Sequence, residues 1–205
     1  MGTSEERTVQ RLEAFSDIVI GFSLAQLGAS TVLNKAMSLD AKGLLTFLAS
    51  FAIVCSLWYF HHRLFQNFFV PKALPIVLNF VWLAVVVLLV FVSVHSSEDG
   101  FNNRNLTLLY FELYALAYGI LVAQTILGIL ERAGAPPELR QKAKGNVLHM
   151  SYWTLAFVAC IVQIRLMPWD AALGAMIGRT FMVAIIGSVL LSVYLRRTRG
   201  VNADA

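Results

Sequence analysis

Three apolar stretches of the sequence begin or end in side chains that can ionise or form hydrogen bonds. These side chains are Arg11, Ser16 and Asp17 in the first stretch, Trp58, His61, His62 and Arg63 in the second, and Asn79 in the third. An acidic group one turn inside an apolar helix is costly without a partner, so we expect Asp17 to pair with Arg11 or with the histidines. Neighbouring histidines point in different directions on a helix, which makes a metal or haem site at His61 and His62 the weaker interpretation. The pattern favours a hydrogen-bond network, with pH sensing as an alternative role because histidine titrates near neutral pH.

The first apolar stretch, residues 14–33, contains more small and polar side chains than a helix surrounded by lipid. On a helical projection Ser16, Ser23, Gln26 and Ser30 fall near one another, and Phe22, Gln26, Ala29 and Leu33 form an adjoining stripe. Polar groups at membrane depth usually face protein or a water-filled path. We therefore expect this helix to line a pore with Phe22, Ser23, Gln26, Ala29 and Ser30. The alternative is that its small and polar residues only allow close packing between helices.

The composition excludes a soluble globular protein. The chain has 205 residues, of which 58% are hydrophobic and 14% charged, with a mean hydropathy of +0.70. Soluble domains are roughly 45–50% apolar and about 25% charged. The net charge of +4 is spread over short loops and tails, so we expect no nucleic-acid partner. Cys55 and Cys160 each lie within an apolar stretch, which predicts neither a disulfide nor a zinc site.

Six stretches are long enough to cross the roughly 30 Å hydrocarbon core of a membrane as helices. They cover approximately residues 14–33, 43–62, 73–95, 105–131, 146–165 and 171–195. The sequence predicts an all-α, polytopic membrane protein with a single six-helix transmembrane domain over residues 1–205, because the connections are too short for a second domain. Residues 1–13 are polar and do not fit a signal peptide, so we expect the first helix to be retained.

The distribution of Lys and Arg predicts that both termini are cytoplasmic. On this orientation the inner side has eleven basic residues, namely Arg7, Arg11, Arg63, Lys72, Arg132, Arg140, Lys142, Lys144, Arg196, Arg197 and Arg199. The outer side has four, namely Lys35, Lys42, Arg104 and Arg165. Glu112 and Arg179 then lie at a similar depth from the outer face, and we expect them to form an ion pair, since each alone is costly in hydrocarbon. The alternative is a protonated or water-exposed Glu112 and an Arg179 that snorkels to the lipid headgroups.

Residues 11–17 resemble a known signature. Arg11-Leu-Glu-Ala-Phe15-Ser16-Asp17 matches the R-x-x-x-F-S-D pattern of the transmembrane protein 175 family, the endolysosomal potassium channels and their bacterial homologues. The segment from Ser50 to Phe65, with Trp58, His61 and His62, resembles the second helix of that family, and Leu78-Asn79 resembles the start of the third. The resemblance is specific over about residues 7–80, and a single set of six helices is similar to the bacterial members.

The resemblance implies a homotetramer in the bacterial plasma membrane, with the four first helices around a central cation pathway, K⁺ as the permeant ion and no cofactor. The signature residues Arg11, Phe15, Ser16 and Asp17, with His61, His62 and Asn79, would form a structural network. Family members continue after the signature with Ile and Leu residues that form a hydrophobic constriction, together with a threonine. Here Phe22, Gln26 and Ala29 take the aliphatic places and Ala25 takes that of the threonine.

Four Phe22 side chains in a ring predict a water-excluding gate, beside which Gln26 could hydrate an ion; the alternative is that Phe22 packs against a neighbouring helix. Potassium selectivity does not follow automatically from the resemblance, because it depends on the width and polarity of the constriction. A non-selective or proton-leak pathway is therefore an alternative. Another alternative is a secondary transporter, although the sequence has no internal duplication. We do not expect an enzyme, because the polar group near His61 lacks a nucleophile and a metal-binding spacing.

Overall fold

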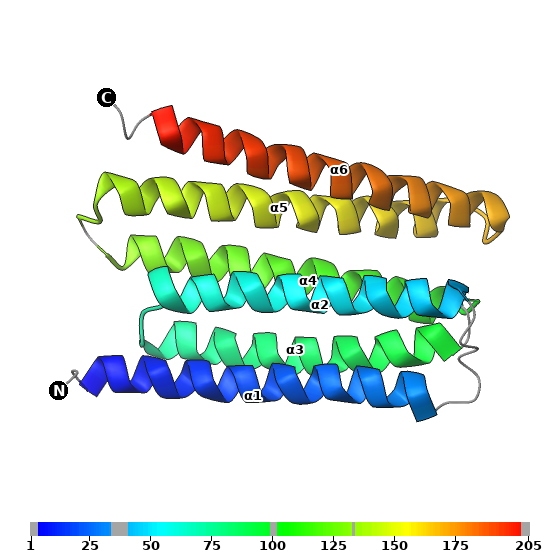
Figure 1. The fold of residues 1–205 in the computed structure, drawn as a ribbon, viewed down its shortest axis with the longest axis horizontal. Helices are drawn as coiled ribbons and strands as arrows, with labels where there is room; N and C mark the ends of the chain where they lie inside the picture. Colours follow the sequence, from blue (N-terminus) through cyan, green and yellow to red (C-terminus); the bar gives the residue numbers. More distant parts are fainter. Residues whose placement is uncertain (1–3, 34–40, 99–101, 133, 202–205) are drawn as a thin grey trace.

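The computed structural model describes residues 4–33, 41–98, 102–132 and 134–201, and the described residues form six α-helices and no strands. The helices are α1 (Ser4–Leu33), α2 (Ala41–Asn67), α3 (Ala73–Glu98), α4 (Arg104–Leu130), α5 (Pro137–Leu166) and α6 (Ala171–Val201). All six run along the long axis of the molecule, and α1 begins at the same end at which α6 finishes (Figure 1). This confirms the prediction of an all-α fold with six helices.

Several helices are longer than the apolar stretches that predicted them. α1 begins at Ser4 rather than near residue 14, and Glu5 and Glu6 in its first turn suit the positive end of the helix dipole. α5 begins at Pro137, within a segment that we expected to be a connection up to residue 145. Hydropathy locates the part of a helix inside the membrane, whereas polar residues with good helix propensity extend the helix beyond it.

The turns that separate the helices follow known local rules. Gly134, between α4 and α5, has a φ of 83°, a conformation that glycine adopts readily. Pro137 occupies the first turn of α5, where its missing N–H has no helical partner to lose. Asn103 caps α4, because its side chain accepts hydrogen bonds from the backbone N–H groups of Asn105 at 3.0 Å and Leu106 at 3.1 Å.

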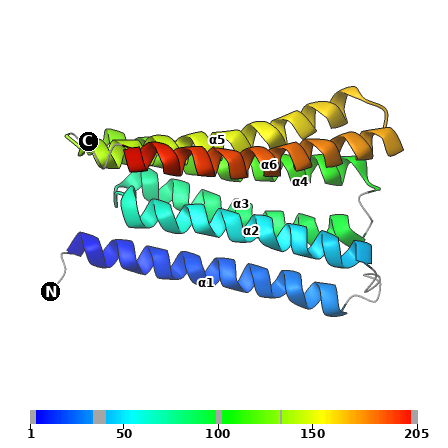
Figure 2. The same ribbon diagram turned by 45° about the horizontal axis from the view of Figure 1, so that its top comes forward.

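The helices are stacked in layers. In Figure 2, α1 lies at one side, α2 and α3 form the middle, and α4, α5 and α6 form the other side. Over the described residues, α1 packs against α3 and α2. α6 packs mainly against α5, with a ring contact between Phe181 and Phe111 of α4 at a centroid distance of 5.7 Å. The edge positions of α1 and α6 leave most of their surfaces outside the protein core.

Aromatic side chains fill the space between α4 and α5. The rings of Tyr114 and Phe157 stack with centroids 4.9 Å apart and an angle of 11°, and Tyr118 stacks on Phe157 at 5.9 Å. All three side chains are fully buried. Gly128 of α4 allows the backbone at Phe68, just after α2, to come close to α4. A Cβ at position 128 would lie 2.0 Å from the carbonyl oxygen of Phe68.

Five helices are long and apolar enough to cross a membrane, as judged from the described side chains. They are α1, α3, α4, α5 and α6. α2 is not among these helices over the side chains that the structure describes.

The expected ion pair between Glu112 and Arg179 is wrong. Arg165, in the last turn of α5, donates to Glu112 Oε1 at 2.7 Å, whereas Arg179 on α6 is exposed. The helix that packs most closely against α4 is α5, whereas α6 packs mainly against α5. The long side chain of Arg165 reaches the carboxylate from the end of the bundle, which a depth count along isolated helices does not take into account.

Candidate functional site

A chain of buried hydrogen bonds joins α1, α2 and α3. His61 Nε2 on α2 lies 2.8 Å from Asn79 Oδ1 on α3, and Asn79 Nδ2 donates to Ser16 Oγ on α1 at 3.3 Å. Ser16 in turn donates to the carbonyl oxygen of Leu12 at 2.8 Å. His61, Asn79 and Ser16 are all completely buried. Because buried polar groups are costly without partners, this chain fixes how the three helices meet.

His61 is also held by aromatic rings. Its imidazole stacks on the Trp82 indole of α3, with centroids 4.2 Å apart and an angle of 9°, and it contacts Phe65 at 4.7 Å. The flat ring of His61 is thus fixed by stacking on one side and by the Asn79 amide at its edge. Trp82 was not expected to take part; its position one turn after Asn79 is the signal that could have indicated it.

Asp17 has a different partner from the two that we expected. Trp58 Nε1 donates to Asp17 Oδ1 at 2.9 Å, so the aspartate of α1 is bound by a tryptophan of α2 and not by Arg11 or a histidine. Arg11 is exposed. The indole N–H is a pure donor and suits a carboxylate that is partly shielded from water.

His62 lies beside this contact and completes a second junction between α1 and α2. Its ring stacks with Trp58 at a centroid distance of 5.5 Å, and its Nδ1 lies 2.9 Å from Glu13 Oε1. His61 and His62 therefore point to different neighbours, as their adjacent positions on a helix predict. In the described residues no three His, Cys, Asp or Glu side chains form a group that could hold a metal ion.

The two faces of α1 differ in what they contact. The face towards α2 and α3 buries Ser16, Ile20, Ser23 and Leu27. The opposite face exposes Phe15, Ile18, Phe22, Gln26 and Ala29, with 73% of Phe22 and 70% of Ile18 accessible within the single chain. Phe15 also contacts Phe80 of α3, at a centroid distance of 6.1 Å.

The structure brings together three of the five residues expected to line a pore. Phe22, Gln26 and Ala29 share the exposed face of α1. Ser23 lies on the buried face, where it donates to the carbonyl oxygen of Val19 at 2.9 Å. The side chain of Ser30 lies outside the described residues. The helical projection grouped serines with Gln26, but in the structure Ser16 and Ser23 follow the side of α1 that packs against protein.

Comparison with known proteins supports the resemblance drawn from the signature. Residues 11–89 match a family model described as "Endosomal/lysosomal potassium channel TMEM175". The fold is similar to a crystal structure described as a lysosomal potassium-selective channel TMEM175 homolog from Chamaesiphon minutus, with a TM-score of 0.68 and 15% sequence identity. The similarity covers 92% of this chain and 98% of the other. No curated protein sequence matches the chain.

These two findings confirm the resemblance to the transmembrane protein 175 family. The sequence match contains the signature at residues 11–17, the polar end of α2 and Asn79, and so includes Ser16, His61 and Asn79 of the hydrogen-bond chain. The match in fold extends to α4, α5 and α6, where the sequence shows only general hydropathy. The family matched is one of ion channels and not a class of enzyme.

Proposed function

We propose that the protein is a potassium channel, in which four copies place their α1 helices around a central pathway. The observation that carries this proposal is the exposed face of α1. This face combines large apolar side chains, Phe22 and Ile18, with Gln26 and small residues. A face in contact with lipid alone would not favour an amide group, whereas a narrow pathway that alternates between apolar and polar rings would use both.

The buried hydrogen-bond chain supports this role by its position. It holds α1 against α2 and α3 through the side of α1 opposite Phe22. A helix attached along one face presents its other face in a fixed direction, which a pore-lining helix requires. We assign Ser16, Asp17, His61 and Asn79 to the fixing of α1, and Phe22, Gln26 and Ala29 to the pathway.

The hydrophobic constriction is proposed to lie at Phe22. Four phenylalanine rings around an axis would exclude water from a short length of the pathway and act as gate, filter or both. Gln26, one turn further along α1, would offer amide oxygens to an ion that leaves the constriction.

Replacement of Phe22 by alanine tests the constriction. Purified protein reconstituted in liposomes should pass K⁺, and Phe22→Ala should increase the flux and reduce the preference for K⁺ over Na⁺. The matched control is Phe91→Ala, which makes the same chemical change at a half-exposed phenylalanine of α3 and should leave flux and selectivity unchanged. An unchanged flux in Phe22→Ala would move the constriction to another residue, with Gln26→Ala as the next variant to measure.

The assembly can be tested separately. A single chain with one helix of this kind cannot enclose an aqueous pathway, so several copies must meet around an axis. We expect a tetramer by native mass measurement in mild detergent. A stable monomer or dimer that still conducts K⁺ would contradict the proposed arrangement.

A further inference from the structure

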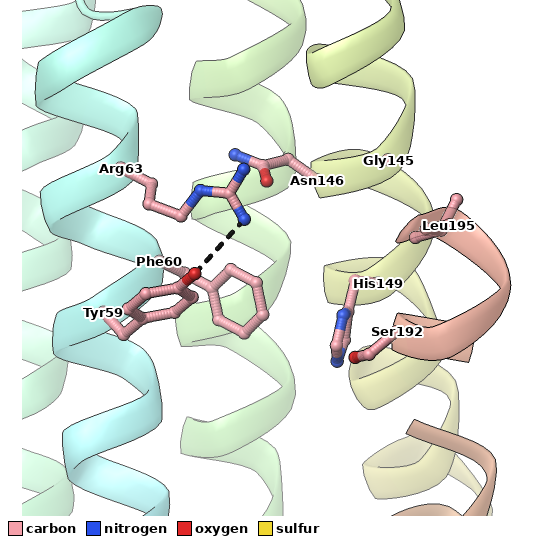
Figure 3. Close-up of a pocket in the computed structure, with 8 residues that line it drawn as sticks. All are labelled: Tyr59, Phe60, Arg63, Gly145, Asn146, His149, Ser192 and Leu195. Carbon is pink, nitrogen blue, oxygen red and sulfur yellow. Dashed lines mark hydrogen bonds between the residues drawn. The ribbon is translucent and has the colours of Figure 1, made fainter. Parts of the chain in front are cut away.

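A polar cavity lies between α2, α5 and α6, away from the exposed face of α1. It has a volume of about 110 Å³ and is lined by Tyr59, Phe60 and Arg63 of α2, Gly145, Asn146 and His149 of α5, and Ser192 and Leu195 of α6 (Figure 3). About 10–15 Å³ of such space is enough to hold one water molecule, so the cavity is large enough for a group of several heavy atoms. None of the eight lining residues is acidic.

Asn146 supplies a hydrogen-bond donor that has no partner. Its side chain is only 2% exposed, and within the described part of the chain Nδ2 forms no hydrogen bond. A buried amide N–H without an acceptor is unfavourable. Since Asn146 lines the cavity, an acceptor placed there would complete its hydrogen bonding.

Arg63 supplies a positive charge without a negative one. Its guanidinium donates to the Tyr59 hydroxyl at 3.5 Å and lies over the Tyr59 ring at 5.6 Å. Among the residues that the structure describes, no carboxylate lies within ion-pair distance of Arg63. In Figure 3 the side chains of Arg63 and Asn146 point towards each other, so two sets of N–H donors face one space.

The opposite wall of the cavity is also polar. His149 Nε2 lies 2.7 Å from Ser188 Oγ, which fixes the imidazole at the edge of the cavity, and Ser192 donates to the carbonyl oxygen of Ser188 at 2.9 Å. These two groups are occupied by Ser188, so the donors left for a ligand are the Arg63 guanidinium and the Asn146 amide. An arginine and an amide that face one space suit an oxyanion, and arginine suits phosphate in particular.

The cavity lies at a boundary of the membrane-spanning segments. Arg63 directly follows the predicted span 43–62, Asn146 begins the span 146–165, and Leu195 ends the span 171–195. Three helices thus place the ends of their predicted spans around one cavity, and the ends of membrane spans are where lipid headgroups are expected. Basic pockets between transmembrane helices at this level are a known way to hold anionic headgroups.

We propose that this cavity binds a phosphate group, supplied by the headgroup of an anionic phospholipid or by free phosphate, through Arg63 and Asn146. The site is independent of the pathway proposed at α1, since no residue is shared between them. Its ligand would connect α2 to α5 and α6, since α2 otherwise contacts these two helices little.

Thermal unfolding of the purified full chain in neutral detergent tests the site without any measurement of flux. Phosphatidylglycerol should raise the melting temperature saturably and more than phosphatidylcholine does. Inorganic phosphate is compared with chloride at equal ionic strength. Stabilisation by the lipid alone assigns the site to a headgroup, and stabilisation by both shows that free phosphate is sufficient.

Two variants and a control connect the effect to the cavity. Arg63→Gln should weaken the apparent affinity about tenfold or more, because a charged donor is lost. Asn146→Asp keeps the shape of the side chain but gives Arg63 a carboxylate, so it should remove the response to phosphate and raise the melting temperature without ligand. Arg140→Gln removes an exposed charge from the start of α5 and should respond as the wild type does.

The proposal is overturned if neither probe stabilises the wild type beyond its comparison. It is also overturned if Asn146→Asp responds as strongly as the wild type, or if Arg140→Gln loses as much of the response as Arg63→Gln. Asn146→Asp keeps the test decisive should Arg63→Gln fail to fold.

Discussion

The N-terminal half of the bundle and the C-terminal half are held together by different kinds of contact. In α1, α2 and α3, Ser16, His61 and Asn79 meet through hydrogen bonds that need particular donors and acceptors. Between α4 and α5, Tyr114, Tyr118 and Phe157 meet through stacked rings. Apolar packing of similar volume can be made by many combinations of residues, whereas a buried hydrogen-bond chain tolerates few. The family match over residues 11–89 falls on the first half, which is what this difference predicts.

The largest effect is expected in the aromatic half. Phe157→Ala removes a fully buried ring that contacts both Tyr114 and Tyr118, and should lower the free energy of unfolding by about 3–5 kcal/mol. The K⁺ flux per folded molecule should remain close to that of the wild type, because this half is assigned to packing. Leu155→Ala, on the exposed side of the same helix, is the control for thermal unfolding. Loss of flux at full folded yield would give α4 and α5 a direct part in conduction.

The second effect is expected at the centre of the hydrogen-bond chain. Asn79→Leu keeps the approximate size of the side chain but leaves Ser16 and His61 without their shared partner, at a cost of about 1–3 kcal/mol for a buried group. Here flux should fall together with stability, since the direction of α1 depends on this contact. Comparison of flux with the yield of assembled protein separates this variant from Phe157→Ala. Equal behaviour of the two variants would remove the distinction between the halves.

A smaller effect is expected at the contact between Asp17 and Trp58, which is less buried. Asp17→Ala should cost about 1 kcal/mol, because it removes one hydrogen bond at the edge of the bundle. Trp58→Phe removes the same bond from the other side, so the double replacement should cost clearly less than the sum of the two. Additive losses in thermal unfolding would show that the indole and the carboxylate do not act as a pair.

The smallest effect is expected for the ion pair between Glu112 and Arg165. Both side chains are partly accessible, so their coupling should be about 0.2–1 kcal/mol and should decrease at high salt. A double-mutant cycle with Glu112→Gln and Arg165→Gln measures it. The same cycle with Arg179→Gln should give no coupling. A coupling as large as the loss in Asn79→Leu would mean that a polar contact contributes as much between α4 and α5 as the hydrogen-bond chain does between α1, α2 and α3.

Hydropathy and charge predicted the six helices and their order, but not the polar helix ends. The start of α5 at Pro137 was missed because its first turns contain polar residues that belong to a helix outside the membrane. The signature predicted that Ser16, His61 and Asn79 would lie together, since their predicted positions share one end of the bundle. It also predicted Arg11 in the same network, whereas the structure leaves Arg11 exposed.

Individual partners could not be predicted from the sequence in the same way. The partner of Asp17 depends on the rotation of α2, which brings the Trp58 indole to the carboxylate. The partner of Glu112 depends on which helix packs next to α4 and on the reach of a long arginine side chain. Ser23 lies on the buried face of α1 because short hydroxyl side chains can bond to their own helix and fit close to a neighbour. Each of these requires the rotation and register of two helices, and the pattern of one helix contains neither.

The common end at which α1 begins and α6 finishes has a consequence for how such a chain can be duplicated. Six helices that run alternately up and down return the polypeptide to the end at which it started, so a second copy joined after α6 would begin in the same orientation as the first. Such a head-to-tail fusion needs only a flexible tether and no additional crossing. A subunit built in this way can become a tandem unit whose two halves then diverge independently. A genetically linked dimer also makes it possible to place a substitution in one of two neighbouring subunits and leave the other unchanged.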